Sequence, residues 1–220
     1  MFSMESFLQR YQTEQRELVV GKRPFRFMVP LSLEPFIDPE DVFNAFPLWT
    51  KVWEASLVLA NRLSAIPPTG EHRWLELGAG LGVVGVVAAA FQHDVTITEY
   101  DPHALDFIHA NARLNHTSPR EIRRLDWLKP DLGTRFDRII GSELIYNERD
   151  FPALRDLFRS LLKPGGEILL AGEVRQTNAA FLDLMQESFR IDIARNTLRT
   201  GSDSTTVLLI RLRPKPSLPA

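Results

Sequence analysis

A run of glycines and a carboxylate near the middle of the chain have the residue types of a cofactor site. The segment LELGAGLGVVG, residues 75–85, contains Gly80, Gly82 and Gly85 in a G-x-G-x-x-G pattern. This pattern suggests a strand, a tight turn and a helix whose N-terminus faces a pyrophosphate. Glu76, however, would repel a pyrophosphate by about 1 kcal/mol or more at contact distance, even in a high dielectric. The loop is therefore expected to bind a ligand that carries positive charge and no phosphate.

S-Adenosylmethionine is such a ligand, because it carries an ammonium and a sulfonium group. Gly78, Gly80 and Gly82 would let the backbone approach it closely. The alternative is that these glycines only form a tight turn between a strand and a helix, while Glu76 pairs with a basic side chain.

Three further residues follow neighbouring predicted strands. Glu99 ends the second strand, where an acidic side chain can hydrogen-bond both ribose hydroxyls. Asp126 and Trp127 follow the third strand, where the carboxylate can accept from an adenine amino group and the indole can cover the ring. Taken singly, Asp126 could be a helix cap and Trp127 a core residue. Together, at successive strand ends, these residues favour the cofactor site.

The elements that must position these residues alternate between strand and helix. Strands are predicted at 73–77, 94–98, 121–125, 135–144, 167–173, 189–195 and 205–213, and helices at 81–91, 102–114, 150–162 and 178–188, with Asp101 as an N-cap and KPGG at 163–166 as a helix stop. This order predicts an α/β fold with a doubly wound, mostly parallel sheet of seven strands. The last two strands have no helix between them, so they must pair in a terminal antiparallel hairpin.

The first 48 residues are predicted to form an N-terminal extension. It comprises a helix over about 1–15, a hairpin over 17–29 that turns at Gly21-Lys22, and an irregular proline-rich segment over 30–48. The main domain is predicted to span 49–213, beginning with a helix at 50–63, and residues 214–220 are expected to be a frayed tail.

Composition bounds the possible functions. The 44% of hydrophobic residues is typical of a globular protein. The net charge of −2 gives no general attraction to nucleic acid or an anionic membrane. Its longest apolar run, at 81–91, is shorter than the roughly 20 residues that span a bilayer, and no signal peptide is apparent. A cytoplasmic location is expected. The absence of cysteine excludes thiolate chemistry, and the five scattered histidines indicate no metal site.

With these residues established, the chain resembles the family-16 seven-strand methyltransferases, many of which methylate lysine in specific proteins. The similarity runs from about Trp49 to Leu212 and rests on WTKVWEASLVLANRL, LELGAGLGVVG, VTITEYD, LDW, GSELIYNE, LLKPGG and LAGEVR. LELGAGLG is common to many methyltransferases, whereas LDW followed by GSELIY is much more specific.

The resemblance implies a Rossmann-like methyltransferase domain over 49–213, S-adenosylmethionine as the cofactor and a protein lysine as the acceptor. By resemblance, the cofactor is bound by Glu76, Gly78, Gly80, Glu99, Asp126 and Trp127, with Trp53 closing over it. Glu143 and Tyr146 are implied to face the reacting amine. Two features depart from the family: glutamate replaces the commoner aspartate at 143, and the segment 22–48 matches nothing in it and is expected to cover the substrate entrance.

Methyl transfer from a sulfonium needs an uncharged nucleophile in line with the carbon–sulfur bond, so positioning dominates the catalysis. A lysine must first lose its proton, and both the positive cofactor and desolvation lower the pKa of its amine. Glu143 can orient that amine and stabilise the ammonium product, while Tyr146 can offer its ring face to the cation. The alternative is a capping carboxylate at Glu143 and a core aromatic at Tyr146.

Other functions remain open on the same residues. A small-molecule N- or O-methyltransferase would have a small closed pocket, whereas an open acidic or apolar groove would favour a protein acceptor. Glu76 disfavours a nicotinamide oxidoreductase, and the pair Glu143 and Tyr146 disfavours a binding module without catalysis. The segment ELIY lacks the Pro-Pro pair of adenine N6-methyltransferases, and no basic stripe is present, so nucleic-acid substrates are not expected. The sequence carries no signal of oligomeric state.

Overall fold

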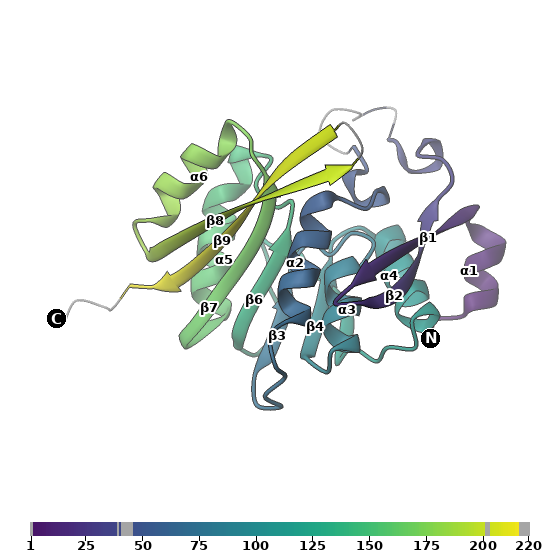
Figure 1. Cartoon of the computed structure of the whole chain (residues 1–220), viewed down its shortest axis with the longest axis horizontal. Helices are drawn as coiled ribbons and strands as arrows, with labels where there is room; N and C mark the ends of the chain where they lie inside the picture. The colour runs from purple at the N-terminus through teal and green to yellow at the C-terminus, as the bar shows by residue number, and fades with distance from the viewer. Residues whose placement is uncertain (1, 39, 41–45, 201–202, 216–220) are drawn as a thin grey trace.

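The computed structural model describes residues 2–38, 40, 46–200 and 203–215. In this part of the chain, a seven-stranded sheet in the order β5-β4-β3-β6-β7-β9-β8 has helices on both faces, and β1 and β2 form a separate two-stranded sheet (Figure 1). The predicted α/β fold, its seven strands and its terminal antiparallel hairpin are confirmed.

The strands of the main sheet are β3 (Arg73–Glu76), β4 (Asp94–Glu99), β5 (Glu121–Arg124), β6 (Phe136–Ser142), β7 (Leu162–Glu173), β8 (Phe189–Thr200) and β9 (Asp203–Pro214). Its helices are α2 (Glu54–Ser64), α3 (Val83–Ala90), α4 (Pro102–Leu114), α5 (Phe151–Leu161) and α6 (Thr177–Met185). The N-terminal part contains α1 (Met4–Arg10), β1 (Thr13–Val20) and β2 (Arg23–Pro30), and short 3-10 turns lie at Glu34–Phe36, Leu48–Thr50 and Glu148–Asp150.

The sheet reverses its winding direction at β3. This strand pairs in parallel with β4 on one side and with β6 on the other, while β9 pairs antiparallel with both β7 and β8. In doubly wound sheets, ligands bind at the carboxyl ends of the strands where the direction reverses. The loops that follow β3, β4, β5 and β6 are therefore in the right place to build a site.

Alternate residues of the strands point to two cores. Trp74 and Ile97 pack with α2, α3 and α4, whereas Leu75, Leu77 and Ile139 pack with α5 and α6 on the other face. The alternation follows from the two-residue period of a strand. The same alternation determines which side chains of β3 face α2, α3 and α4 and which face α5 and α6.

The N-terminal hairpin turns where predicted, with positive φ at both Gly21 (+55°) and Lys22 (+66°), as a type I′ turn requires. The Asn111 side chain on α4 accepts from the Met28 N–H at 2.7 Å and donates to the Met28 carbonyl at 3.2 Å. Residues 23–30 thus lie against α4. Of the segment 22–48 that was expected to cover the substrate entrance, only its end at 46–48 lines the cavity described below, and 39 and 41–45 lie outside the described residues.

Several predicted boundaries shift. The helix predicted from residue 50 begins at Glu54, because Leu48–Thr50 forms a 3-10 turn. The KPGG segment does not stand between helix and strand; it lies inside β7, where Gly165 has φ +76° and the pairing with β6 shifts register. Pairing continues into the segment 214–220 that was predicted to be a frayed tail, since Pro214 pairs with Phe189 and the Lys215 N–H donates to the Ser188 carbonyl at 3.0 Å. Residues 216–220 lie outside the described part.

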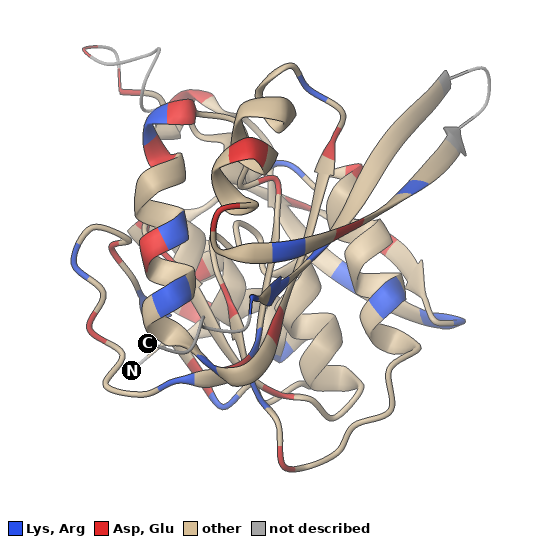
Figure 2. Ribbon diagram, turned by 90° about the vertical axis from the view of Figure 1, so that its left-hand side faces the viewer, with Lys and Arg blue, Asp and Glu red and all other residues tan. Residues whose placement is uncertain are grey.

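The strands β8 and β9 extend beyond the rest of the sheet as a projecting hairpin (Figure 2). Figure 2 also shows Lys and Arg interspersed with Asp and Glu along the ribbon. In the described part of the chain, no helix is long and apolar enough to span a bilayer. The same residues contain no group of three or more metal-ligating side chains.

Candidate active site

An open cavity of about 1140 Å³ lies at the carboxyl ends of β3, β4, β5 and β6. The loops after these strands line it, together with Phe46–Trp49, Lys51 and Trp53 from the segment before α2. The sequence-predicted residues that it brings together are Trp53, Gly78, Gly80, Glu99, Asp126, Trp127, Glu143 and Tyr146. Two predicted residues are not among its described lining: Gly82, which is the N-cap of α3, and Glu76.

The glycine loop after β3 has a left-handed backbone at Gly78, Gly80 and Gly82. Gly78 and Gly80 both have φ of +56°, in the left-handed region that disfavours other residues. A Cβ on Gly78 would lie 2.8 Å from Leu144 Cδ2, and one on Gly80 would lie 3.5 Å from the Trp49 backbone. The loop is thus pressed between the β6 loop and the segment before α2, with its backbone exposed to the cavity.

Glu99 holds the glycine loop in place. Its Oε2 accepts from the Gly80 N–H at 2.8 Å, and its Oε1 accepts from the N–H groups of Tyr100 at 2.6 Å and Asp101 at 3.3 Å. Burial raises the pKa of Glu99, and these hydrogen bonds oppose the rise. Because a carboxylate oxygen has two lone-pair sites, at least one acceptor site remains free for a ribose hydroxyl.

Glu99→Ala is expected to weaken S-adenosylmethionine binding by about 1–3 kcal/mol, since the loop N–H groups and a ribose hydroxyl would lose their acceptor in a partly buried site. Isothermal titration calorimetry measures this directly. Asp94→Ala is a control, because that residue lies at the opposite end of the same strand and pairs with Arg120. Unchanged affinity in Glu99→Ala would contradict the ribose assignment.

Asp126 and Trp127 line the cavity from the loop after β5. Asp126 Oδ1 accepts from the Leu128 N–H at 2.9 Å, which shapes the turn, and its Oδ2 has no hydrogen bond among the described residues. The six-membered ring of Trp127 would lie 3.4 Å from a Cβ on Gly78, so the indole packs beside the glycine loop. Both residues border the cavity, and Trp127 is only half-buried.

Glu76 lies behind the glycine loop and not at its mouth. Its side chain is 1% exposed and faces α3, where a Cβ on Gly85 would collide with Glu76 Oε2. Burial raises the pKa of Glu76 well above its ordinary value, a hydrogen bond from the Gly85 N–H lowers it, and the nearby Glu99 raises it. Glu76 therefore does not lie at contact distance from a ligand in the cavity, although the sequence had led us to expect this. The alternation of side chains along β3 directs the Glu76 side chain towards α3. Glu76 could therefore affect cofactor binding only by supporting the conformation of the glycine loop.

This burial makes stability depend on pH. The pKa of Glu76 is higher in the folded state than in the unfolded state, so its protonated form stabilises the fold. This stabilisation is fully present below the unfolded pKa near 4.5 and is lost as the pH rises through the folded pKa. We expect Glu76→Gln, which has the same shape and cannot ionise, to exceed wild type in unfolding free energy at neutral pH. Urea titrations from pH 5 to 8 should show this difference growing with pH. A difference that stays constant would mean that Glu76 does not titrate abnormally.

Glu143 has an unusual backbone conformation directly after β6. Its φ is +55°, which costs a residue with a side chain about 1–2 kcal/mol, and its N–H donates to the Ala171 carbonyl of β7 at 2.8 Å. Such strain is concentrated at functional sites. Burial raises the pKa of Glu143, whereas the Glu173 N–H and the Arg175 guanidinium lower it.

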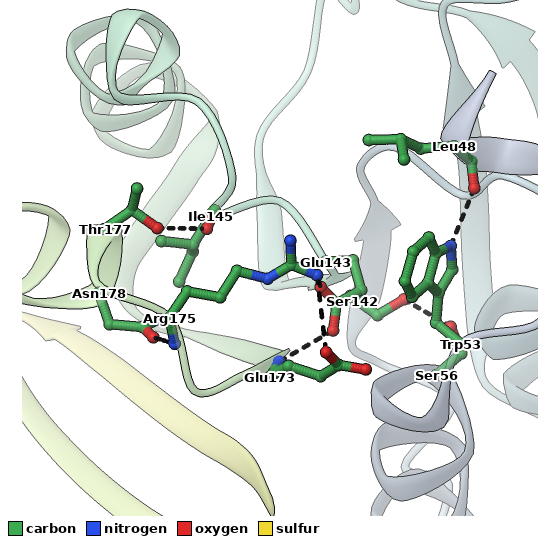
Figure 3. A network of polar contacts seen from close by, with 10 residues as sticks. All are labelled: Leu48, Trp53, Ser56, Ser142, Glu143, Ile145, Glu173, Arg175, Thr177 and Asn178. Atoms are coloured by element: carbon green, nitrogen blue, oxygen red, sulfur yellow. Dashed lines mark hydrogen bonds and ion pairs between the residues drawn. The ribbon is translucent and has the colours of Figure 1, made fainter. Parts of the chain in front are cut away.

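Arg175 is a site residue for which the sequence suggested no role, although it ends the LAGEVR motif. Its Nη2 donates to Glu143 Oε2 at 2.7 Å, and its Cζ lies 5.9 Å from the centre of the Trp53 ring (Figure 3). The Trp53 Nε1–H donates to the Leu48 carbonyl at 2.9 Å, and Lys51 Nζ lies 4.2 Å from the same ring. Two cations, Lys51 and Arg175, therefore lie close to the Trp53 ring at the edge of the cavity.

Tyr146 is 43% exposed and borders the cavity, which excludes the alternative of a core aromatic. Its pKa is raised, first by desolvation of the hydroxyl and then by Asp150 and Glu99. The tyrosine therefore stays neutral at physiological pH and presents a ring and a hydroxyl to the cavity.

Comparison with known proteins agrees with this geometry. Residues 45–188 match the family described as lysine methyltransferase. The protein N-lysine methyltransferase METTL21A of Xenopus tropicalis is 37% identical over 152 residues, 64% of this chain and 68% of the relative. The EEF1A lysine methyltransferase 3 of Mus musculus is 31% identical over 179 residues, 77% of this chain and 74% of the relative. A tRNA methyltransferase of Pyrococcus abyssi, solved in complex with S-adenosyl-L-homocysteine, shares the fold with a TM-score of 0.61 at 15% identity, over 92% of this chain and 45% of that one.

Proposed function

Because this chain belongs to the lysine methyltransferase family, we propose that it transfers a methyl group from S-adenosylmethionine to a lysine side chain of a protein. The observation that carries the proposal is the meeting of Glu143 and Tyr146 with the glycine loop in one cavity. The Glu143 carboxylate can receive a cationic amine, while the loop backbone and Glu99 can receive a nucleoside. We assign the methyltransferase domain to 49–213 and the N-terminal extension to 1–48.

The residues around the glycine loop fit the cofactor. The loop residues Gly78, Ala79 and Gly80 border the cavity, Glu99 keeps an acceptor site for a ribose, and Trp127 offers a flat apolar wall with Asp126 beside it. When bound, S-adenosylmethionine would supply an electrophilic methyl group and a positive charge. Trp53 would close the side of the site that faces α2.

The chain's own residues would then act on the acceptor. Glu143 would accept a hydrogen bond from the amine, which fixes the direction of its lone pair, and would stabilise the ammonium formed after transfer. The Tyr146 ring would face the same cation. The lysine ammonium must give its proton to water before transfer, and the positive charge of the bound cofactor lowers the pKa of that amine.

A protein acceptor is favoured by the open, apolar mouth of the cavity. Five of its lining side chains are large, hydrophobic and exposed: Phe46, Leu48, Tyr100, Leu128 and Tyr146. Exposed apolar groups gathered around one opening are typical of an interaction site. A pocket built for a small molecule would instead enclose most of the ligand surface.

The proposal is tested with methyl-tritiated S-adenosylmethionine and two acceptor preparations, a cell extract and purified EEF1A, the protein named for the mouse relative. Label should enter acid-precipitable protein and be recovered as methyllysine after hydrolysis. The Glu143→Gln variant is the control for contaminating activities. Label found only in the small-molecule fraction would refute a protein acceptor, and the small-molecule methyltransferase would replace it.

A further inference from the structure

The ion pair between Glu143 and Arg175 joins the end of β6 to the segment that follows β7 (Figure 3). We propose that Arg175 is a positioning residue that keeps the Glu143 carboxylate ionised and directed into the cavity. This inference rests on the proposed function, because it assumes that Glu143 receives the acceptor amine.

Both oxygens of Glu143 are held from the same side. The Glu173 N–H donates to Oε1 at 2.9 Å, and Arg175 Nη2 donates to Oε2 at 2.7 Å. The Glu143 backbone is attached to β7 as well, through its N–H and the Ala171 carbonyl. One stretch of chain, 171–175, therefore fixes the strained backbone and the side chain of this residue together.

Arg175 holds Glu143 without taking the place of the amine. Glu143 lines the cavity, whereas Arg175 is not among the lining residues in the described part of the chain. The guanidinium therefore approaches from the β7 side. Since each carboxylate oxygen has two acceptor sites and uses one here, Glu143 keeps free acceptor capacity towards the cavity.

Arg175 is itself held at this position. Its backbone N–H donates to the Asn178 side chain at the start of α6, and Thr177 Oγ1 donates to the Ile145 carbonyl at 3.1 Å, which ties α6 to the Glu143 loop. The Arg175 side chain lies against the Trp53 ring and is 34% exposed, against 12% for Glu143. The planar guanidinium presents its donors in a fixed fork, so it loses less freedom for each hydrogen bond that it forms.

The charges around Glu143 make this pairing necessary. From the end of β7, Arg175 is the adjacent cation and Glu173 a second carboxylate, 3.9 Å from Arg175. Tyr146 and the turn Glu148–Asp150 line the same cavity, and Lys51 Nζ lies over the Trp53 ring. Burial and Glu173 raise the pKa of Glu143, and Arg175 opposes both. Loss of Arg175 would raise the pKa of Glu143 further, and a protonated Glu143 could not stabilise an ammonium product.

The test follows the Glu143 carboxyl carbon by NMR in the full chain labelled with [5-13C]glutamate, its signal identified as the one missing from Glu143→Gln. In Arg175→Met, the titration midpoint of this signal should move to higher pH, and methyl transfer to extract protein at pH 7 should fall about 10-fold or more. In Arg175→Lys, which keeps the charge, the midpoint should stay near that of wild type and part of the activity should return.

Arg155→Met is the matched control, because Arg155 is 24% exposed and its Nε lies 3.1 Å from Asp156, outside the cavity. It should change neither readout. An unmoved midpoint in Arg175→Met, or a lysine variant as impaired as the methionine variant, would overturn the positioning role. Wild-type transfer by Glu143→Gln is a different failure: it would remove Glu143 from the reaction and refute that part of the proposed function, whatever the NMR midpoint of the arginine variants.

Discussion

Glu143→Gln is expected to leave S-adenosylmethionine affinity within a few-fold of wild type and to reduce methyl transfer by roughly 100-fold or more. The amide keeps the shape of the side chain and one oxygen acceptor, but it cannot offset the positive charge that the acceptor nitrogen develops. In the native structure the carboxylate borders the cavity and is 12% exposed, so solvent cannot take over its role. Calorimetry gives the affinity, and label transferred into methyllysine gives the rate.

Two milder variants sharpen the result. Glu143→Asp should retain partial activity, since the charge remains and only the reach shortens, towards the residue commoner in the family. Shortening also draws the carboxylate away from Arg175, which limits the recovery. Tyr146→Phe should cost less than Glu143→Gln if the ring face matters more than the hydroxyl. A Glu143→Gln protein that binds cofactor and turns over normally would rule this residue out of the mechanism.

Local signals made much of the site predictable. Glu99, Asp126 and Glu143 each lie at or just after the end of a strand, and parallel strands bring their carboxyl ends to one edge of a sheet. The structure places all three around the same cavity. The hairpin at Gly21-Lys22 and the N-cap at Asp101, which accepts from the His103 N–H at 2.7 Å, were equally local. Their chemical roles at the cavity remain proposals.

What the sequence could not predict depends on contacts between distant segments. Glu143 and Arg175 are 32 positions apart, and nothing in either motif reveals that their side chains meet. The direction of Glu76 depends on which face of β3 turns towards α3, and a strand of four residues buried on both faces gives no periodic signal of this. The hairpin packs on α4 through Asn111, a single buried amide whose partner lies 83 positions away.

Two tryptophans should separate cofactor binding from folding. Trp74 on β3 is 2% exposed, with its ring centre 4.5 Å from that of His93 and 5.3 Å from Arg138 Cζ. Trp74→Ala should lower the free energy of unfolding by about 3–5 kcal/mol, as truncation of a large core side chain does. It should leave cofactor affinity per folded molecule unchanged, because Trp74 faces the helices and not the cavity.

Trp127→Ala is expected to behave in the opposite way. This residue is half-buried beside Gly78 and borders the cavity, so its removal exposes one wall of the site and leaves most of the core intact. Loss of a stacked ring should weaken S-adenosylmethionine binding about 10-fold, with a smaller change in unfolding free energy than in Trp74→Ala. Urea denaturation and calorimetry on both variants give the comparison. If both lose stability and bind cofactor as wild type does, the LDW segment serves the core, and the adenine must be held by another wall of the cavity.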